Sequence, residues 1–173
     1  MKESKRISLI CLEERSTLET VALRGALEYM DYIVSVHWVG SEKRFTELLS
    51  DKTLTDKNII LSGHGYEDGF LLSDNKIVKP GVFKDHIAWP GKNVLSLGCK
   101  TGTEEFIDAF KNGEVETFIA PKEYPDASTS LVFVIHFFLL LKKGGDIRAA
   151  FEGSKELDKE LDSFTLYERT PSS

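Results

Sequence analysis

The sequence has few cysteines, no excess of basic residues and no long apolar run. Two cysteines, Cys11 and Cys99, are too few for a disulfide framework or a thiolate zinc site. The 22 lysines and arginines are outnumbered by 28 acidic residues and are spread along the chain, which argues against a nucleic-acid partner. The longest apolar block, residues 131–141, is well short of the ~20 residues that span a bilayer. We therefore expect a buried helix there and no membrane partner.

The start of the chain lacks a signal-peptide pattern, since charged residues precede only a short apolar run. We therefore expect a cytoplasmic protein. Its length fits a single domain over residues 1–173, and an apolar content of 41% is enough to build a core. Three convergent metal ligands cannot be assembled from the sequence, and no phosphate-binding motif includes Gly63 or Gly65. We expect no metal and no other cofactor.

Segments with strand and helix patterns alternate along the chain. Strands are expected at 6–14, 32–40, 57–64, 92–99, 115–121 and 163–168, a hairpin at 68–81, and helices at 16–30, 41–51, 103–113, 127–143 and 146–161. Ser16 and Glu19 have the spacing of a capping box at the first helix. The alternation predicts an α/β fold, a three-layer α/β/α sandwich with a mostly parallel sheet of about six strands.

Two of the predicted strands end in matching sequences. Residues 58–69 are NIILSGHGYEDG and residues 93–102 are NVLSLGCKTG, and aligning them pairs His64 with Cys99. Ligands and chemistry collect beyond the carboxyl ends of parallel strands. If the two strands are neighbours, their backbones lie ~4.8 Å apart, and the imidazole and the thiol can converge over one site.

A histidine that converges with a cysteine can perform the chemistry of a cysteine hydrolase. The pKa of a thiol falls near a helix N-terminus or a protonated histidine, and a predicted helix follows Cys99 closely. His64 can assist the thiol and protonate the leaving amine, while the backbone N–H groups of Gly65 and Cys99 stabilise the oxyanion. We therefore expect Cys99 to be the nucleophile and His64 the general acid and base.

These residues resemble the caspase-like clan (clan CD) of cysteine peptidases. An apolar strand that ends in His-Gly, followed by a second strand that ends in cysteine, is typical of that clan. The bacterial CHAT branch is the closer likeness: residues 99–102 fit its Cys-x-Thr-Gly pattern, and the segments 68–83, 118–151 and 164–167 follow its order. The resemblance implies a cysteine endopeptidase, a hydrolase that acts on a protein or peptide substrate through a Cys-His dyad. The resemblance is also compatible with a regulatory protein partner.

Four acidic residues follow two of the predicted strands: Glu13, Glu14, Glu123 and Asp126. Acidic residues at such places are usually solvated loop charges. The alternative for Glu123 and Asp126 is substrate binding, because the fifth strand should end on the same side of the sheet as the histidine and the cysteine. Asp126 also stands roughly where the CHAT branch carries an aspartate. The resemblance therefore implies cleavage after arginine or lysine.

Two other functions stay open. A catalytically inactive interaction module with the same fold is one, because Leu97-Gly98 replaces the usual Ser-Ala of the CHAT branch. A small-ligand-binding doubly wound domain, in which the strand-end glycines only open a pocket, is the other. By itself Cys99 would be an inert buried thiol and His64 a turn histidine, and their matched positions favour function. The resemblance also implies that strand three lies between strand one, which holds Cys11, and strand four. Two strand spacings of ~9.6 Å would then exceed the ~7 Å limit for a disulfide to Cys99, so Cys11 is expected in the core.

Overall fold

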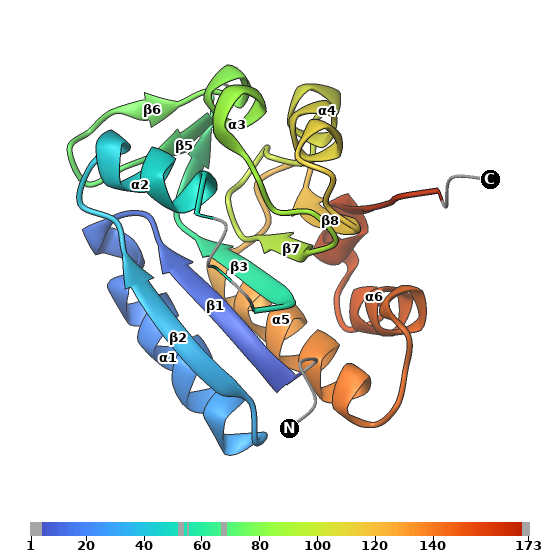
Figure 1. The fold of residues 1–173 in the computed structure, drawn as a ribbon. Helices are drawn as coiled ribbons and strands as arrows, with labels where there is room; N and C mark the ends of the chain where they lie inside the picture. Colours follow the sequence, from blue (N-terminus) through green and yellow to red (C-terminus); the bar gives the residue numbers. More distant parts are fainter. Residues whose placement is uncertain (1–4, 52–53, 55, 67–68, 171–173) are drawn as a thin grey trace.

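The computed structural model describes residues 5–51, 54, 56–66 and 69–170, and its centre is a six-stranded sheet (Figure 1). The strands are β1 (Arg6–Cys11), β2 (Ile33–Trp38), β3 (Asn58–Ser62), β7 (Asn93–Ser96), β8 (Thr117–Pro121) and β9 (Phe164–Glu168). Their order in the sheet is β2-β1-β3-β7-β8-β9, and β9 pairs antiparallel with β8 while the other pairs are parallel. The predicted mostly parallel sheet is confirmed.

Helices cover both faces of the sheet, which confirms the predicted α/β/α sandwich (Figure 1). One face packs against α2 (Glu42–Leu49), α3 (Pro80–His86) and α4 (Glu104–Asn112), and the other against α1 (Thr17–Tyr29), α5 (Ala127–Lys142) and α6 (Ile147–Lys155). The described residues also form two short 3₁₀ helices, η2 (Glu14–Ser16) and η3 (Lys159–Ser163). Burial on both faces explains why the strands have continuous apolar runs rather than alternating ones.

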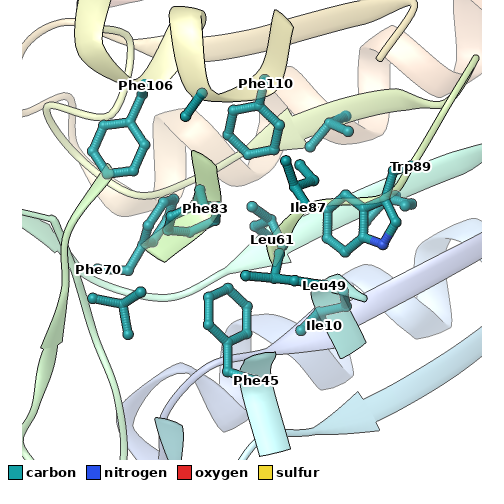
Figure 2. Packing of buried hydrophobic residues seen from close by; sticks show 14 of the residues in the cluster. Ile10, Phe45, Leu49, Leu61, Phe70, Phe83, Ile87, Trp89, Phe106 and Phe110 are labelled. Carbon is teal, nitrogen blue, oxygen red and sulfur yellow. The ribbon is translucent and has the colours of Figure 1, made fainter. Parts of the chain in front are cut away.

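Aromatic side chains fill the core between the sheet and the layer of α2, α3 and α4 (Figure 2). Phe83 lies at its centre, with ring centroids 5.3 to 5.5 Å from those of Phe45, Phe70, Phe106 and Phe110. Tilted and edge-to-face rings at such distances add to the stabilisation that burial provides. This aromatic cluster packs α2, α3 and α4 firmly against one face of the sheet.

The pairing register of β3 and β7 is the one that the matching sequences predict. Asn58 lies opposite Asn93, and Leu61 opposite Ser96. On its other side β3 pairs with β1, and Cys11 lies opposite Ser62. Strand three therefore lies between strands one and four, as the resemblance implied. Both cysteines are free, and Cys11 is a core residue.

Two predicted segments have a different structure. The hairpin expected at 68–81 is part of a three-stranded antiparallel sheet of β4 (Gly65–Tyr66), β5 (Gly69–Leu71) and β6 (Ile77–Val78), while Asp68 lies outside the described residues. The helix expected at 146–161 ends at Lys155. The carboxylate of Asp158 then caps η3 by accepting the N–H of Glu160 at 2.9 Å. A separate 3₁₀ helix therefore begins after Asp158, and α6 does not continue through this segment.

Helix α3 has no counterpart among the predicted helices. It is only seven residues long and begins with Pro80, a residue that suits the first helical position but also marks turns. The apolar helix predicted at 127–143 is confirmed as α5, which buries Phe133, Phe137 and Phe138 in the core. In the described part of the chain, no helix combines the length and the apolar character needed to cross a membrane.

Candidate active site

His64 and Cys99 follow the neighbouring strands β3 and β7, and both line one small cavity of about 60 Å³. Gly65 lies directly against the cysteine. A Cβ atom placed on Gly65 would be 2.1 Å from the carbonyl oxygen of Cys99 and 2.7 Å from its backbone nitrogen, far inside van der Waals contact. Glycine is therefore required next to the histidine, because it lets the two strand ends approach.

A set of short hydrogen bonds fixes the loop that carries Cys99, residues 97–102. The hydroxyl of Thr101 lies 2.8 Å from that of Ser96 and donates to the carbonyl of Gly98 at 2.6 Å. Lys100 takes the left-handed conformation (φ 58°). Its N–H donates to the carbonyl of Glu123 at 3.1 Å, so the loop is also tied to the segment after β8. The cysteine thus lies on a tightly held turn.

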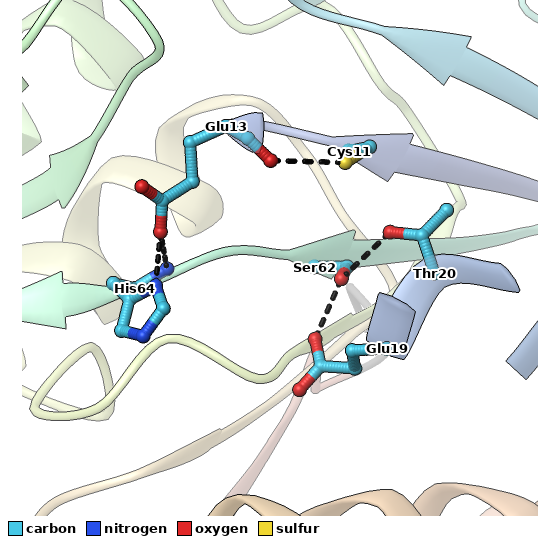
Figure 3. A network of polar contacts seen from close by, with 6 residues as sticks. All are labelled: Cys11, Glu13, Glu19, Thr20, Ser62 and His64. Atoms are coloured by element: carbon cyan, nitrogen blue, oxygen red, sulfur yellow. Dashed lines mark hydrogen bonds and ion pairs between the residues drawn. The ribbon is translucent and has the colours of Figure 1, made fainter. Parts of the chain in front are cut away.

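A buried carboxylate holds the histidine (Figure 3). Glu13 Oε1 accepts the backbone N–H of His64 at 3.2 Å and also bonds to the ring nitrogen Nδ1. Glu13 is only 4% exposed, whereas the side chain of His64 is 51% exposed. The expectation that Glu13 is a solvated loop charge is wrong. Cys11 lies opposite Ser62 in the parallel pair of β1 and β3. Glu13 and His64 each come two residues later, so they lie opposite each other.

This contact assigns the protonation of the imidazole. A carboxylate only accepts hydrogen bonds, so Nδ1 of His64 carries the proton that faces Glu13. In the neutral ring, Nε2 is then left as an acceptor. The ring can take a proton at that nitrogen, which is what a general base beside a thiol needs.

A second acidic residue, Glu19, lines the cavity itself. Glu19 on α1 accepts the hydroxyl of Ser62 at 2.6 Å through Oε1, and Ser62 accepts that of Thr20 at 3.0 Å (Figure 3). Partial burial raises the pKa of Glu19, while the bond from Ser62 and the nearby His64 oppose that shift. The capping box predicted for Ser16 and Glu19 is not formed, because the Ser16 side chain makes no capping bond.

The surroundings of Cys99 do not lower the pKa of its thiol. Partial burial raises the pKa of Cys99, its own backbone N–H lowers it, and the negative charge of Glu19 raises it further. The lowered thiol pKa expected from the following helix is therefore wrong. Helix α4 begins only at Glu104, five residues after the cysteine. The negative charges of Glu104 and Glu105 lie in its first turn and offset the positive end of the helix dipole, so that the dipole has little effect on the thiol. The thiol needs a base to become nucleophilic.

The two acidic residues predicted to bind substrate lie in the segment after β8 and have partners within the protein. Asp126 caps α5: its carboxylate accepts the N–H groups of Ser128 at 2.8 Å and Thr129 at 3.3 Å, and these bonds lower its pKa. Glu123 Oε2 lies 3.6 Å from the ammonium nitrogen of Lys100. The same segment also contributes to the wall of the cavity beside the cysteine. Substrate binding by Asp126 and Glu123 stays a prediction.

Larger hollows lie at the opposite edge of the sheet, where the strands begin. Their volumes are about 810 and 630 Å³, and Lys57 lines both of them. Neither is lined by His64 or Cys99, so the small cavity at the carboxyl edge is the candidate site. Within the described ranges, no group of three or more histidine, cysteine, aspartate or glutamate side chains converges as a metal site would require.

The sequence by itself matches no protein-family model and no curated protein. Solved structures do share its fold. The Arg-specific cysteine proteinase gingipain R superposes with a TM-score of 0.66 at 11% identity over 96% of this chain and 46% of that chain. The complex of Porphyromonas gingivalis RgpB pro- and mature domains gives 0.64, at 11% identity over 95% and 47%. Separase from Saccharomyces cerevisiae, in complex with securin, gives 0.65 at 13% identity over 96% and 12%.

The chain therefore spans about half of the gingipain R chain that it matches and about an eighth of the separase chain. At such identities the likeness concerns the fold. Almost the whole chain is covered in each comparison. The chain has the caspase-like fold that gingipain R and separase share.

Proposed function

We propose that this chain is a cysteine endopeptidase of the caspase-like type. One observation carries the proposal: Glu13, His64 and Cys99 follow three adjacent strands, β1, β3 and β7, and the histidine is held by a buried carboxylate while it lines the same cavity as the thiol. In this proposal Cys99 and His64 form the catalytic dyad. The caspase-like fold supports it, as does the Cys-x-Thr-Gly likeness of residues 99–102 to the CHAT branch.

The proposed reaction begins with proton transfer from the Cys99 thiol to Nε2 of His64. The resulting thiolate attacks the scissile carbonyl carbon, and the backbone N–H groups of Gly65 and Cys99 stabilise the oxyanion. The imidazolium then gives its proton to the leaving amine as the C–N bond breaks. Water, deprotonated by the same imidazole, hydrolyses the thioester and releases the carboxylate product with the thiol restored.

The proposed substrate is a protein or peptide with arginine or lysine before the scissile bond. The sequence predicts Asp126 and Glu123 as the acidic residues that bind this side chain, and gingipain R, which has the same fold, is described as Arg-specific. We also propose a regulatory protein partner. Two of the similar structures are complexes of this kind, RgpB with its pro-domain and separase with securin.

A peptidyl electrophile with arginine at its reactive end tests the proposal. We expect a covalent adduct on Cys99 that is lost in Cys99→Ala and strongly slowed in His64→Ala, whereas Cys11→Ala, a variant of the other thiol, still forms it. Hydrolysis of a fluorogenic peptide should fall in the same variants, and the double variant should be no worse than the single ones, because the two residues act as a unit. Circular dichroism serves as the folding control.

The alternative function, an inactive interaction module with this fold, predicts no adduct on the folded wild-type protein with any peptidyl electrophile. A Cys99→Ala protein that still cleaved the peptide at the wild-type rate would also contradict the proposed mechanism.

A further inference from the structure

We infer that Glu19 is the residue that selects the substrate of the proposed peptidase, by binding the cationic side chain of the residue just before the scissile bond. This inference rests on the proposed function, and it names the group that recognises the substrate.

The first step of the argument is the position of Glu19. The cavity beside Cys99 lies between the start of α1 and the start of α5, and among the described residues that line it Glu19 is the one carboxylate. Apart from His64 and Cys99, the other described residues that line the cavity carry no charge, with Leu97, Pro125 and Ser130 among them. A side chain attached to a carbonyl at the cysteine would enter this cavity and meet the carboxylate.

The second step is the bonding of the carboxylate. Glu19 Oε1 accepts the hydroxyl of Ser62, while Oε2 has no hydrogen-bond partner among the residues that the structure describes. Nor does any described lysine or arginine form an ion pair with Glu19. The charge of nearby His64 opposes only part of the cost of burying this carboxylate, because burial still raises its pKa. A charge-assisted bond from a lysine or arginine of the substrate would offset the rest of that cost.

The third step is the comparison with the other acidic residues nearby. Glu13 is committed to His64 through two bonds. Asp126 accepts a hydrogen bond from the backbone at the start of α5, and Glu123 forms an ion pair with Lys100. Of these four acidic residues, Glu19 is the one whose side chain lines the cavity beside Cys99.

The charge of Glu19 also makes the recognition depend on pH. The groups that act on its carboxylate from the neighbouring elements are Ser62 and His64 at the end of β3 and Glu13 after β1, while the Cys99 thiol shares the cavity. Burial raises the pKa of Glu19 above its ordinary value of 4.5. Glu19 ionises only as the pH rises through this raised pKa, so the preference for a cationic substrate should increase in that direction.

The experiment uses two peptidyl electrophiles that differ only in the reactive-end residue, arginine or the uncharged, similarly long citrulline. The second-order rate of Cys99 labelling is measured with each, and their ratio reports the selection. We expect Glu19→Gln to lower the arginine-to-citrulline ratio by ~10- to 100-fold, the value of one charge-assisted bond. The wild-type ratio should rise with pH, whereas that of Glu19→Gln should stay flat. Exposed Glu14→Gln is the matched control and should keep the wild-type ratio.

Each outcome decides between the hypotheses. A ratio that falls in Asp126→Asn or Glu123→Gln but not in Glu19→Gln would overturn the role of Glu19 and support the two residues predicted from the sequence. A wild-type protein that labels equally well with both probes would overturn the inference and leave the peptidase standing. Failure of Cys99 to label with either probe would remove the proposed function itself. Melting curves exclude misfolding of each variant.

Discussion

Glu13 binds His64 twice through one oxygen, once at the backbone N–H and once at the ring nitrogen Nδ1. The backbone bond fixes where the residue lies, and the ring bond fixes how the imidazole is turned. Because Glu13 is buried, both bonds are shielded from competing water. The carboxylate therefore sets position, orientation and tautomer of the histidine together.

The first prediction concerns this carboxylate. Glu13→Gln should lower kcat by ~10²- to 10⁴-fold, the usual contribution of a correctly positioned acid–base group. The amide can donate to Nδ1 and so favour the other tautomer, with the proton on Nε2. Nitrogen-15 NMR of His64 checks the cause: the wild-type ring should have a protonated Nδ1, and the variant should lose that signal. Glu14→Gln, an exposed neighbour, is the control, and an equal loss in both variants would contradict the assignment.

The second prediction concerns the two thiols. Cys99 should react with iodoacetamide faster than Cys11, because Cys11 is 2% exposed and Cys99 is partly exposed. Burial raises the pKa of both thiols, so the difference comes from access and from the neighbouring base. Mass spectrometry of peptides after brief treatment measures it, and the difference should shrink in His64→Ala. Faster modification of Cys11 than of Cys99 would contradict the assignment of the candidate site to Cys99.

The third prediction concerns the contact between the two strand ends. Gly65→Ala should destabilise the protein by ~1 to 3 kcal/mol and abolish activity, since the added methyl group would overlap the backbone of Cys99. Gly25→Ala is the matched control: this helical glycine has nothing within 4 Å of an added Cβ, so alanine should stabilise by ~0.5 to 1 kcal/mol. Urea unfolding of both variants tests the pair. A Gly65→Ala protein with wild-type stability would show that the strand ends do not touch.

The fourth prediction concerns stability and pH. The pKa of Glu19 is raised in the folded state, chiefly by desolvation, above its ordinary value of 4.5. Between these two pKa values the folded protein binds more protons than the unfolded chain, so stability falls as the pH rises through that window. Glu19→Gln cannot ionise and should melt higher than the wild type at pH 8, by ~2 to 4 °C per kcal/mol gained.

The melting difference should shrink as the pH is lowered toward 4.5, where Glu19 is protonated in the folded wild type. Calorimetry at several pH values measures it. A difference that does not change with pH would mean that packing, and not the charge, is responsible.

Much of the fold is predictable because its signals are local or repeated. Alternating strands and helices predict the sandwich, and the matching sequences around Asn58 and Asn93 predict the observed register of two strands that are not consecutive in the chain. That register is enough to bring His64 and Cys99 to one place. The helix α3 was not predictable in the same way, because the sequence of a short helix that begins with proline resembles that of a turn.

The acidic partners of the site were not predictable from local sequence. Glu13 resembles any charged residue after a strand, and its burial follows only from the pairing of β1 with β3. Glu19 has the spacing of a helix cap, but Ser62 from a distant strand binds its carboxylate instead. A usable signal did exist for Glu13. Applying the strand-end argument to strand one as well as to strands three and four would have placed it opposite His64.

The bonds that tie the loop of residues 97–102 to the segment after β8 also determine when the candidate site can form during synthesis. The N–H groups of Lys100 and Gly102 donate to carbonyls of Glu123 and Pro121, which leave the ribosome later than the cysteine does. Domains fold as units while the chain emerges. A nascent chain that has exposed Cys99 but not β8 therefore lacks the anchors of this loop. If the chain is the peptidase proposed above, it can become active only after most of the domain is made, which would protect the unfinished polypeptide and its neighbours from cleavage.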